Sequence, residues 1–142
     1  MPEILKLQNG SDIRGVAIEA EGEKVNLTEH TAYAITRSFA GFIIGKFPGK
    51  KSYAATVGTD SRLSGQLLKK AIINAFTDEG FLVYDAALTS TPAIFMSTVF
   101  EETNADCGIM ITASHLPYNR NGMKFFTKQG GLDKNDIKNI LL

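Results

Sequence analysis

The chain has 142 residues, of which 44% are hydrophobic and 21% are charged. This composition is typical of one globular domain with a sizeable core, and it excludes a disordered protein. Basic and acidic residues number 15 each, so the formal net charge is zero and charge favours neither nucleic acid nor an anionic membrane as a partner.

A single cysteine, Cys107, excludes an internal disulfide. It lies in an apolar run, which favours a buried structural thiol over a redox site. The N-terminus lacks the charged-then-apolar pattern of a signal peptide, and no apolar stretch reaches membrane-spanning length. We therefore expect a soluble protein in a reducing, cytoplasmic setting.

The first half of the chain predicts two helices around a strand. From Asn26 onwards apolar residues recur at near-helical spacing, with Asn26 or Thr28 as N-cap, and a segment rich in glycine ends this helix. A β-rich run bounded by glycine predicts a strand at 52–58. Residues 61–79 form the clearest amphipathic helix, and Gly80 is its C-terminal stop.

The second half continues this alternation. Strands are expected at 81–85 and 107–113. Between them, Thr91 precedes Pro92, a pair typical of a helix N-terminus, and this helix is expected to end near Glu101. Strands and helices that alternate with short connections indicate an α/β fold with a largely parallel sheet.

Two further elements complete the chain. A last strand is expected at 123–127, paired at an edge of the sheet. A helix starts near Asp133 and stops without a C-cap at Leu142, which predicts a fragment of a longer protein. A complete domain with a frayed tail is the alternative.

Three polar loops follow or adjoin strand-like runs, where ligand sites of parallel α/β sheets collect. Residues 112–124 combine a hydroxyl, an imidazole, a proline turn, two asparagines, a glycine and a lysine. The loops at 59–62 and 10–15 each contain Asp-x-Arg. Cations in such loops point to an anionic substrate, with phosphate the obvious candidate.

Each Asp-x-Arg pattern also permits a local ion pair that pins its loop. This alternative is favoured for Asp60 and Arg62, whereas for Arg14, which glycines flank, ligand contact and pinning remain equally open. A hydrolase pair of Ser114 and His115 is the weaker alternative, because adjacent residues of an extended segment point in opposite directions. The Gly-x-Ser-x-Gly elbow is absent. One cysteine and two histidines are too few for zinc, and His30 is expected on a helix surface.

Residues 112–124, Thr-Ala-Ser-His-x-Pro-x-x-x-Asn-Gly-x-Lys, resemble the active-site serine loop of the α-D-phosphohexomutases, the superfamily of phosphoglucomutase and phosphomannomutase. Residues 11–15, Ser-Asp-Ile-Arg-Gly, resemble its N-terminal Arg-Gly loop, and 57–65, Val-Gly-x-Asp-x-Arg-Leu-Ser-Gly, a third signature. The three occur in the family's order and span nearly the whole chain.

The resemblance implies a three-layer α/β/α domain with a mixed, mostly parallel sheet. It implies an intramolecular phosphotransferase that interconverts hexose 1-phosphate and 6-phosphate through a bisphosphate. Ser114 would carry the phosphoryl group, with His115, Lys124 and Arg14 as the other catalytic residues. Supporting or phosphate-binding roles are implied for Ser11, Arg62 and Asn121. Asn121 and Gly122 would form the turn that brings Lys124 beside Ser114.

The family binds Mg²⁺ through an Asp-Gly-Asp-Gly-Asp-Arg loop in a second domain, with the phosphoserine as the remaining ligand. This loop is missing here, as are the third-domain sugar loop and the fourth-domain phosphate clamp. Residues 1–142 are therefore expected to be domain I of a longer multidomain enzyme, truncated near Leu142 and inactive alone. Ser114 would be its metal ligand through the phosphate, and hexose phosphate and the remaining domains its partners.

Two positions bear on the subfamily. Leu116 stands where many relatives have Asn, and Thr112 favours the phosphomannomutase and phosphoglucomutase side over phosphoglucosamine mutases, which typically read Ser-Ala-Ser-His. A non-catalytic α/β module that binds sugar phosphates or a protein through the same loops remains the alternative function. A reading frame that ends naturally at Leu142 would favour this module.

Overall fold

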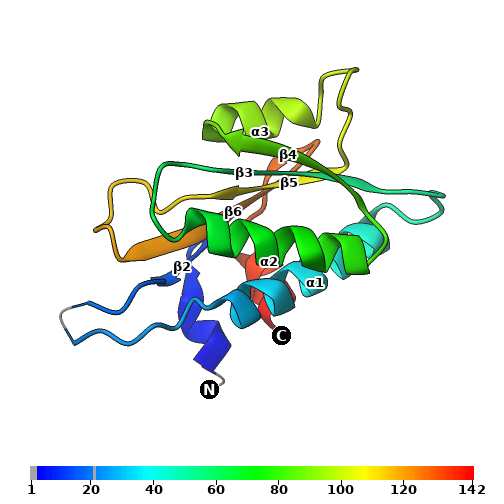
Figure 1. Cartoon of the computed structure of the whole chain (residues 1–142). Coiled ribbons are helices and arrows are strands. Elements are labelled where there is room, and N and C mark those ends of the chain that lie inside the picture. Colours follow the sequence, from blue (N-terminus) through cyan, green and yellow to red (C-terminus); the bar gives the residue numbers. More distant parts are fainter. Residues whose placement is uncertain (1–2, 21) are drawn as a thin grey trace.

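A computed structural model describes residues 3–20 and 22–142 of the chain. Within these residues, a seven-stranded sheet carries helices on both faces (Figure 1). In chain order the elements are η1 (Glu3–Leu7), β1 (Gln8–Asn9), β2 (Asp12–Val16), α1 (Glu29–Lys46), β3 (Ala54–Thr59), α2 (Gly65–Asp78), β4 (Leu82–Leu88), α3 (Thr91–Ser97), β5 (Cys107–Ile111), β6 (Arg120–Thr127), β7 (Gly130–Gly131) and α4 (Lys134–Leu141).

The sheet is mixed, as expected. Its order is β1-β2-β6-β5-β3-β4, with β7 pairing with β6. Strand β3 pairs in parallel with β4 and β5, whereas the other pairings of the described strands are antiparallel. The parallel part is therefore smaller than the alternation of helices and strands predicts. Strand β6 follows β5 through a short loop instead of a helix, and such a connection joins antiparallel strands.

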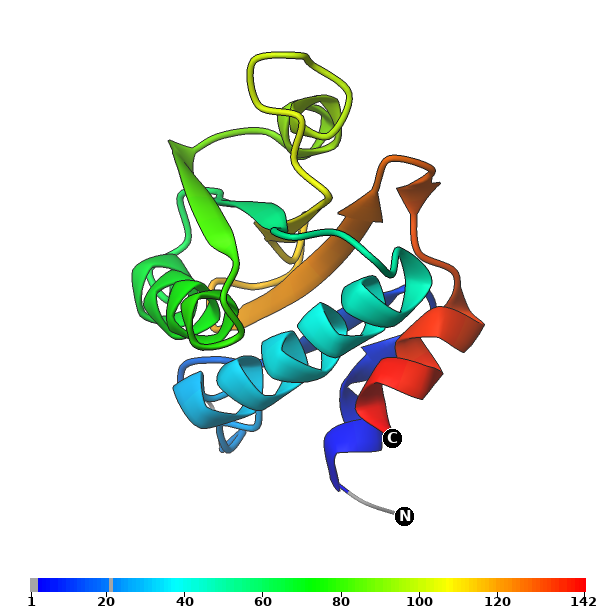
Figure 2. The same cartoon turned by 90° about the vertical axis from the view of Figure 1, so that its right-hand side faces the viewer.

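The helices form the outer layers of an α/β/α arrangement. Helices α1 and α2 lie on one face of the sheet and α3 on the other (Figure 1). Helix α4 lies beside α1, close to the N-terminal η1 (Figure 2). Among the described residues, no helix combines the length and the apolar character needed to cross a membrane.

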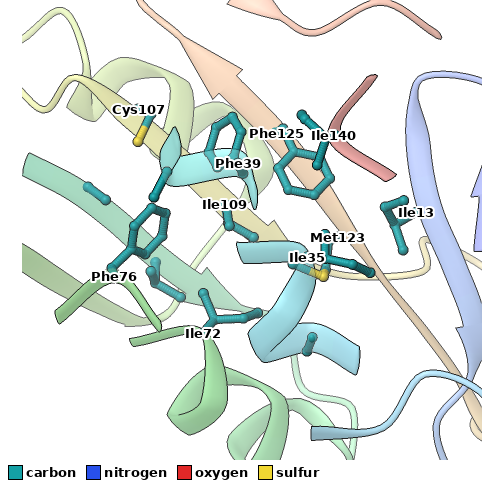
Figure 3. Packing of buried hydrophobic residues seen from close by; sticks show 14 of the residues in the cluster. Ile13, Ile35, Phe39, Ile72, Phe76, Cys107, Ile109, Met123, Phe125 and Ile140 are labelled. Carbon is teal, nitrogen blue, oxygen red and sulfur yellow. The ribbon is translucent and has the colours of Figure 1, made fainter. Parts of the chain in front are cut away.

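The main core lies between the sheet and α1 and α2 (Figure 3). Its centre is an aromatic cluster, in which the ring of Phe39 packs edge-on against Phe125 at 4.8 Å and against Phe76 at 6.2 Å between centroids. Cys107 is also fully buried in this core. Burial raises the pKa of its thiol well above the ordinary value, and the charge of Asp106 raises it further. A buried, unreactive thiol is thus the role that the structure gives Cys107.

Strand β6 serves both faces of the sheet, because successive side chains of a strand point to opposite sides. Met123 and Phe125 belong to the main core. Phe126 points the other way, toward Phe95 of α3, with 6.2 Å between ring centroids. Lys124 therefore shares the α3 face of the sheet. A seven-residue helix such as α3 is only about 10 Å long, so it covers just part of this face.

In the first half of the chain the start of α1 and the end of α2 follow the sequence signals, whereas α2 begins at Gly65 and not at residue 61 as expected. Thr28 is the N-cap of α1, and its Oγ1 accepts a hydrogen bond from the Thr31 N–H at 3.0 Å. Asn26, the other candidate cap, instead accepts from the Val16 N–H at 2.7 Å. Helix α2 is followed by Gly80 in the left-handed region, φ +83°, which confirms the expected stop.

Helix α3 differs from the prediction at both ends. Ser90 rather than Thr91 is the N-cap, with its Oγ accepting from the Ala93 N–H at 3.3 Å. The helix ends at Ser97, well before Glu101. The hydroxyl of Ser97 donates to the Ile94 carbonyl at 2.6 Å, and such local bonds compete with the carbonyl–amide bonds that would continue a helix.

The strand expected at 123–127 is present as part of β6, but its expected place at an edge of the sheet was wrong. Strand β6 begins at Arg120 and lies inside the sheet, between β5 and β2. The N-terminal loop predicted at 10–15 is likewise a strand from Asp12 onwards, with Arg14 paired opposite Gly122. Both errors have the same cause. Where β2 and β6 pair with each other, both strands contain polar residues and a glycine, so neither segment has the composition of a strand inside a sheet.

Candidate active site

Ser114 lies just beyond the carboxyl end of β5, in the loop of residues 112–119 that connects β5 to β6, here called the serine loop. Its side chain is exposed, and its backbone has φ +56°, in the left-handed region that residues other than glycine rarely adopt. The Ser114 N–H donates to Thr112 Oγ1 at 3.1 Å. The site is therefore a solvent-facing serine on a constrained backbone.

Asp60 anchors this loop to the neighbouring strand end. The Thr112 hydroxyl donates to Asp60 Oδ2 at 2.6 Å, and the Asp60 N–H donates to the Ile111 carbonyl at 3.2 Å. Asp60 Oδ1 accepts from the Arg62 N–H at 3.1 Å. Because β3 and β5 are parallel neighbours, their carboxyl ends meet at one edge of the sheet and bring the two loops together.

The guanidinium of Arg62 lies on the serine loop. It donates to the carbonyl oxygens of Ser114 at 2.7 Å, Pro117 at 2.8 Å and Arg120 at 3.1 Å. Its Nε is 3.6 Å from Asp60 Oδ2, so the expected ion pair is present. The Arg62 side chain is only 11% exposed.

A second cluster of charges lies on strands β2 and β6. Lys124 Nζ is 2.8 Å and Arg14 Nη2 is 3.4 Å from Asp12 Oδ2, so two cations share one carboxylate. All three side chains are partly exposed, between 16% and 24%. The cluster keeps a net positive charge, which suits it to attract an anion.

A glycine is required at position 122, where the serine loop and the charged residues of β2 and β6 lie next to each other. A Cβ at this position would lie 2.4 Å from the Ile13 carbonyl oxygen, 2.8 Å from that of Thr112 and 3.1 Å from Arg14 Cγ. Gly122 lies within β6, so the prediction that Asn121 and Gly122 form a turn was wrong. The glycine instead allows the neighbouring strands and the Arg14 side chain to approach β6 closely.

Asn121 supports the site from the buried side. It is fully buried, its Nδ2 donates to Ser64 Oγ at 2.8 Å, and its Oδ1 accepts from the Gly122 N–H at 2.9 Å. These bonds satisfy its side chain and tie β6 to the residue that precedes α2. Ser64 is a supporting residue that the sequence analysis missed, because no local pattern links two residues so far apart in the chain.

The register of the sheet sets the spacing of the cations. Gly122 lies opposite Arg14 on one side, and its carbonyl accepts from the Thr112 N–H at 3.0 Å on the other, so Arg14 is level with the start of the serine loop. Lys124 is two residues, or about 7 Å, further along β6. Ser11 is exposed in the turn between β1 and β2, at the end of β2 remote from the serine loop. The structure thus groups Arg14 with Lys124 and Arg62 with Ser114, and leaves Ser11 apart.

Beside Ser114 a pocket of about 410 Å³ opens to solvent. It is lined by Asp60, Ser61, Arg62, Leu63, Ser114, Leu116 and Tyr118. Leu116 therefore contributes an apolar wall to this pocket. His115 is exposed, and no hydrogen bond among the described residues joins it to Ser114. His30 is exposed on α1, as expected.

Comparisons with known proteins give one consistent family. Residues 5–141 match the family model described as phosphoglucomutase/phosphomannomutase, alpha/beta/alpha domain I. The phosphoglucosamine mutase of Finegoldia magna is 39% identical over 122 residues, which are 85% of this chain and 24% of the relative. That of Alkaliphilus metalliredigens is 39% identical over 125 residues, 88% of this chain and 25% of the relative. The chain thus spans about a quarter of the length of these curated relatives.

The fold has a counterpart among solved structures. A phosphoglucomutase/phosphomannomutase family protein from Burkholderia thailandensis superposes with a TM-score of 0.78 at 23% identity, over 99% of this chain and 29% of that protein. At 23% identity this similarity shows the fold alone, whereas the sequence matches show the family. The chain belongs to the phosphoglucomutase/phosphomannomutase family, and it corresponds to the α/β/α domain I of that family.

Proposed function

We propose that this chain is the phosphoserine-bearing domain of a phosphohexomutase, which interconverts hexose 1-phosphate and hexose 6-phosphate. The observation that carries this proposal is the setting of Ser114, an exposed hydroxyl on a constrained loop at the carboxyl end of β5. Arg14 and Lys124 supply positive charge on the adjoining strands. Membership in the family and the mutase names of the relatives support the same reaction class.

In the proposed reaction, phosphorylated Ser114 gives its phosphoryl group to the free hydroxyl of a hexose monophosphate. The P–O bond to serine breaks as the bond to the sugar oxygen forms, and the proton of that hydroxyl replaces the phosphoryl group on the serine oxygen. The resulting hexose 1,6-bisphosphate then returns its other phosphoryl group to Ser114. Such transfers depend mainly on positioning and charge neutralisation.

The roles of the other residues follow from their places. Arg14 and Lys124 would neutralise phosphate oxygens, and Lys124 would also assist proton transfer. His115, exposed beside Ser114, would orient the transferring group. Asn121 would act through the loop and strand that it supports. For Ser11, exposed in its turn, a phosphate-binding role rests on the family resemblance.

A magnesium ion would supply further charge neutralisation in the full-length enzyme, with the phosphate on Ser114 as one ligand. The described residues of this chain do not make such a site alone, because they contain no group of three His, Cys, Asp or Glu side chains placed to hold a metal. Asp12 and Asp60 are already paired with Lys124 and Thr112. Magnesium sites normally use carboxylates, so the other ligands would come from outside this chain.

The sugar remains to be assigned among hexose phosphates. The curated relatives are named phosphoglucosamine mutases, which adds glucosamine phosphate to the glucose and mannose phosphates as a substrate to be tested. Thr112 is a weak guide to this choice. Its hydroxyl donates to Asp60 and accepts from the Ser114 N–H, and a serine offers the same donor and acceptor.

The test is an assay of the full reading frame that contains this chain. With glucose, mannose and glucosamine 1-phosphates as substrates, we expect conversion of at least one to its 6-phosphate, and ³²P labelling of Ser114 from the bisphosphate. Ser114→Ala should abolish both, whereas Ser52→Ala, at an exposed serine before β3, should change neither. Full activity of Ser114→Ala would refute the phosphoserine mechanism.

The chain of 142 residues should show no turnover by itself, because its relatives are about four times as long. Turnover by the purified chain would refute the need for further domains. Binding of sugar phosphates without turnover, in a protein whose reading frame ends at Leu142, would instead favour a non-catalytic binding module.

A further inference from the structure

We propose that Arg62 is the positioning residue that holds Ser114 in its left-handed conformation. The link to catalysis rests on the proposed function, in which Ser114 carries the phosphoryl group. In this role Arg62 binds the backbone of the serine loop and not the substrate.

Two carbonyl groups of the serine loop and that of Arg120, the first residue of β6, converge on a single cation. The oxygens of Ser114, Pro117 and Arg120 all accept from Arg62, from the Nη1 and Nη2 nitrogens of one planar guanidinium. Carbonyl dipoles that point at one another repel, and a cation between them offsets this repulsion. The guanidinium presents its donors in a fixed fork, and its hydrogen bonds are charge-assisted. The loop therefore folds around Arg62.

Both peptide groups that flank the Ser114 Cα are fixed by this arrangement. The Ser114 N–H is bonded to Thr112 Oγ1 at 3.1 Å, and its carbonyl is bonded to Arg62 Nη2 at 2.7 Å. Thr112 is in turn bonded to Asp60, the partner of the Arg62 backbone. A left-handed conformation is unfavourable for a residue other than glycine, so it persists only where neighbours enforce it. Arg62, Asp60 and Thr112 form that enforcing network.

The contrast with Arg14 separates the two Asp-x-Arg patterns. The Nη1 and Nη2 nitrogens of Arg62 are engaged by loop carbonyls, and its side chain is 11% exposed. Arg14 makes a single side-chain hydrogen bond among the described residues, from Nη2 to Asp12 Oδ2 at 3.4 Å, while the buried Nε atoms of both arginines have no hydrogen-bond partner there. Arg14 thus keeps more terminal donors for an anion, whereas those of Arg62 are used by the backbone around Ser114.

The functional consequence is a loss of turnover with little loss of binding. Displacement of a reacting group by about 1 Å can cost about a hundredfold in rate. We expect Arg62→Ala to lower kcat by about a hundredfold, with KM within about threefold of wild type, because in this proposal Arg62 binds the backbone of the serine loop and contributes little to substrate binding. Arg62→Lys keeps the charge but not the fork, and should lower kcat by about tenfold.

The experiment combines two readouts on the full-length protein. Hydrogen–deuterium exchange of peptides that cover residues 112–120 reports the loop, and steady-state kinetics with the hexose phosphate that the enzyme turns over reports catalysis. Arg37→Ala is the matched control, an arginine on α1 whose partners are Glu79 and Tyr33. Circular dichroism and thermal unfolding check that each variant folds, and Arg62→Lys replaces Arg62→Ala if the latter does not.

The expected result is exchange in the serine loop that is faster by about tenfold in Arg62→Ala, together with the fall in kcat, and neither change in Arg37→Ala. Unchanged exchange in the loop would overturn the proposal, and so would faster exchange with an unchanged kcat. If the wild-type protein itself transfers no phosphoryl group, the proposed function fails, and loop exchange alone decides whether Arg62 holds Ser114.

Discussion

Asp12 and Lys124 are separated by 112 positions in the sequence, yet their side chains form an ion pair of 2.8 Å across the neighbouring strands β2 and β6. Arg14 contacts the same carboxylate oxygen at 3.4 Å. Asp12 therefore has two opposing effects on an incoming anion. It holds the two cations in place, and it neutralises part of their charge.

The charge effect should dominate when Asp12 is replaced by its neutral isostere. Asp12→Asn keeps a hydrogen-bond acceptor for Lys124 and raises the net charge of the cluster by one. We expect inorganic phosphate to bind about fivefold more tightly, a gain of about 1 kcal/mol that shrinks at high salt. Titration calorimetry at low and high ionic strength measures this. Glu79→Gln removes a negative charge elsewhere and should leave affinity unchanged, and weaker binding in Asp12→Asn would contradict the prediction.

A methyl group at position 122 should be costly, since its Cβ would lie 2.4 Å from the Ile13 carbonyl oxygen. We expect Gly122→Ala to lower the free energy of unfolding by about 2–3 kcal/mol, because backbone atoms must move apart. The same substitution at Gly41 meets open space within α1 and should raise stability by about 0.5–1 kcal/mol. Urea denaturation compares the two variants, and equal midpoints would argue against close strand packing at Gly122.

Because the backbone of Ser114 is left-handed, glycine and alanine at this position should differ in their effect on the free energy of unfolding. Both Ser114→Gly and Ser114→Ala remove the hydroxyl, but only glycine adopts φ +56° without steric cost. We expect the glycine variant to be the more stable by about 1 kcal/mol. Thermal and urea unfolding of the two variants measure the difference. An alanine variant as stable as the glycine variant would indicate that position 114 is not left-handed in solution.

Cys107 should make the protein less stable in alkali. Its thiol pKa is raised in the folded state, above the unfolded value of about 8.5, so its contribution to stability is complete below pH 8.5 and is lost as the pH rises toward the folded pKa. Wild type should then lose up to about 1.4 kcal/mol per pH unit more than Cys107→Ala. Urea unfolding across this range measures the slopes, and equal slopes would contradict the prediction. A thiol reagent should label Cys107 only on unfolding.

Most local features of this fold could be predicted from sequence, although both ends of α3 could not, and the non-local features could not. The N-cap at Thr28 and the stop at Gly80 depend on residues within one helical turn, and both were found. The position of β6 inside the sheet depends on its pairing with β2, more than a hundred residues earlier. A short polar segment such as 12–16 carries no pattern that reveals this partner.

The candidate site, like the fold, has features that could be predicted from the sequence and features that could not. The serine loop has a compact motif, so Ser114 and its neighbours could be singled out directly. The target of Arg62 lies 52 positions away in the sequence, and the hydrogen bond between Asn121 and Ser64 joins residues 57 positions apart. These contacts arise because parallel strands bring their carboxyl ends together, and this geometry appears only once the strand order is known.

Side chains of β6 alternate between the two faces of the sheet, so this strand contributes both to the main core and to the proposed site. Met123 and Phe125 fill the main core, while Gly122 and Lys124 face the proposed site. Loss or gain of one residue within β6 would exchange the two sets, with a lysine placed in the core and core side chains such as Met123 placed on the face of the proposed site. The site can therefore diversify only by substitution at alternate positions of this strand, whereas the loops around it remain free to change in length.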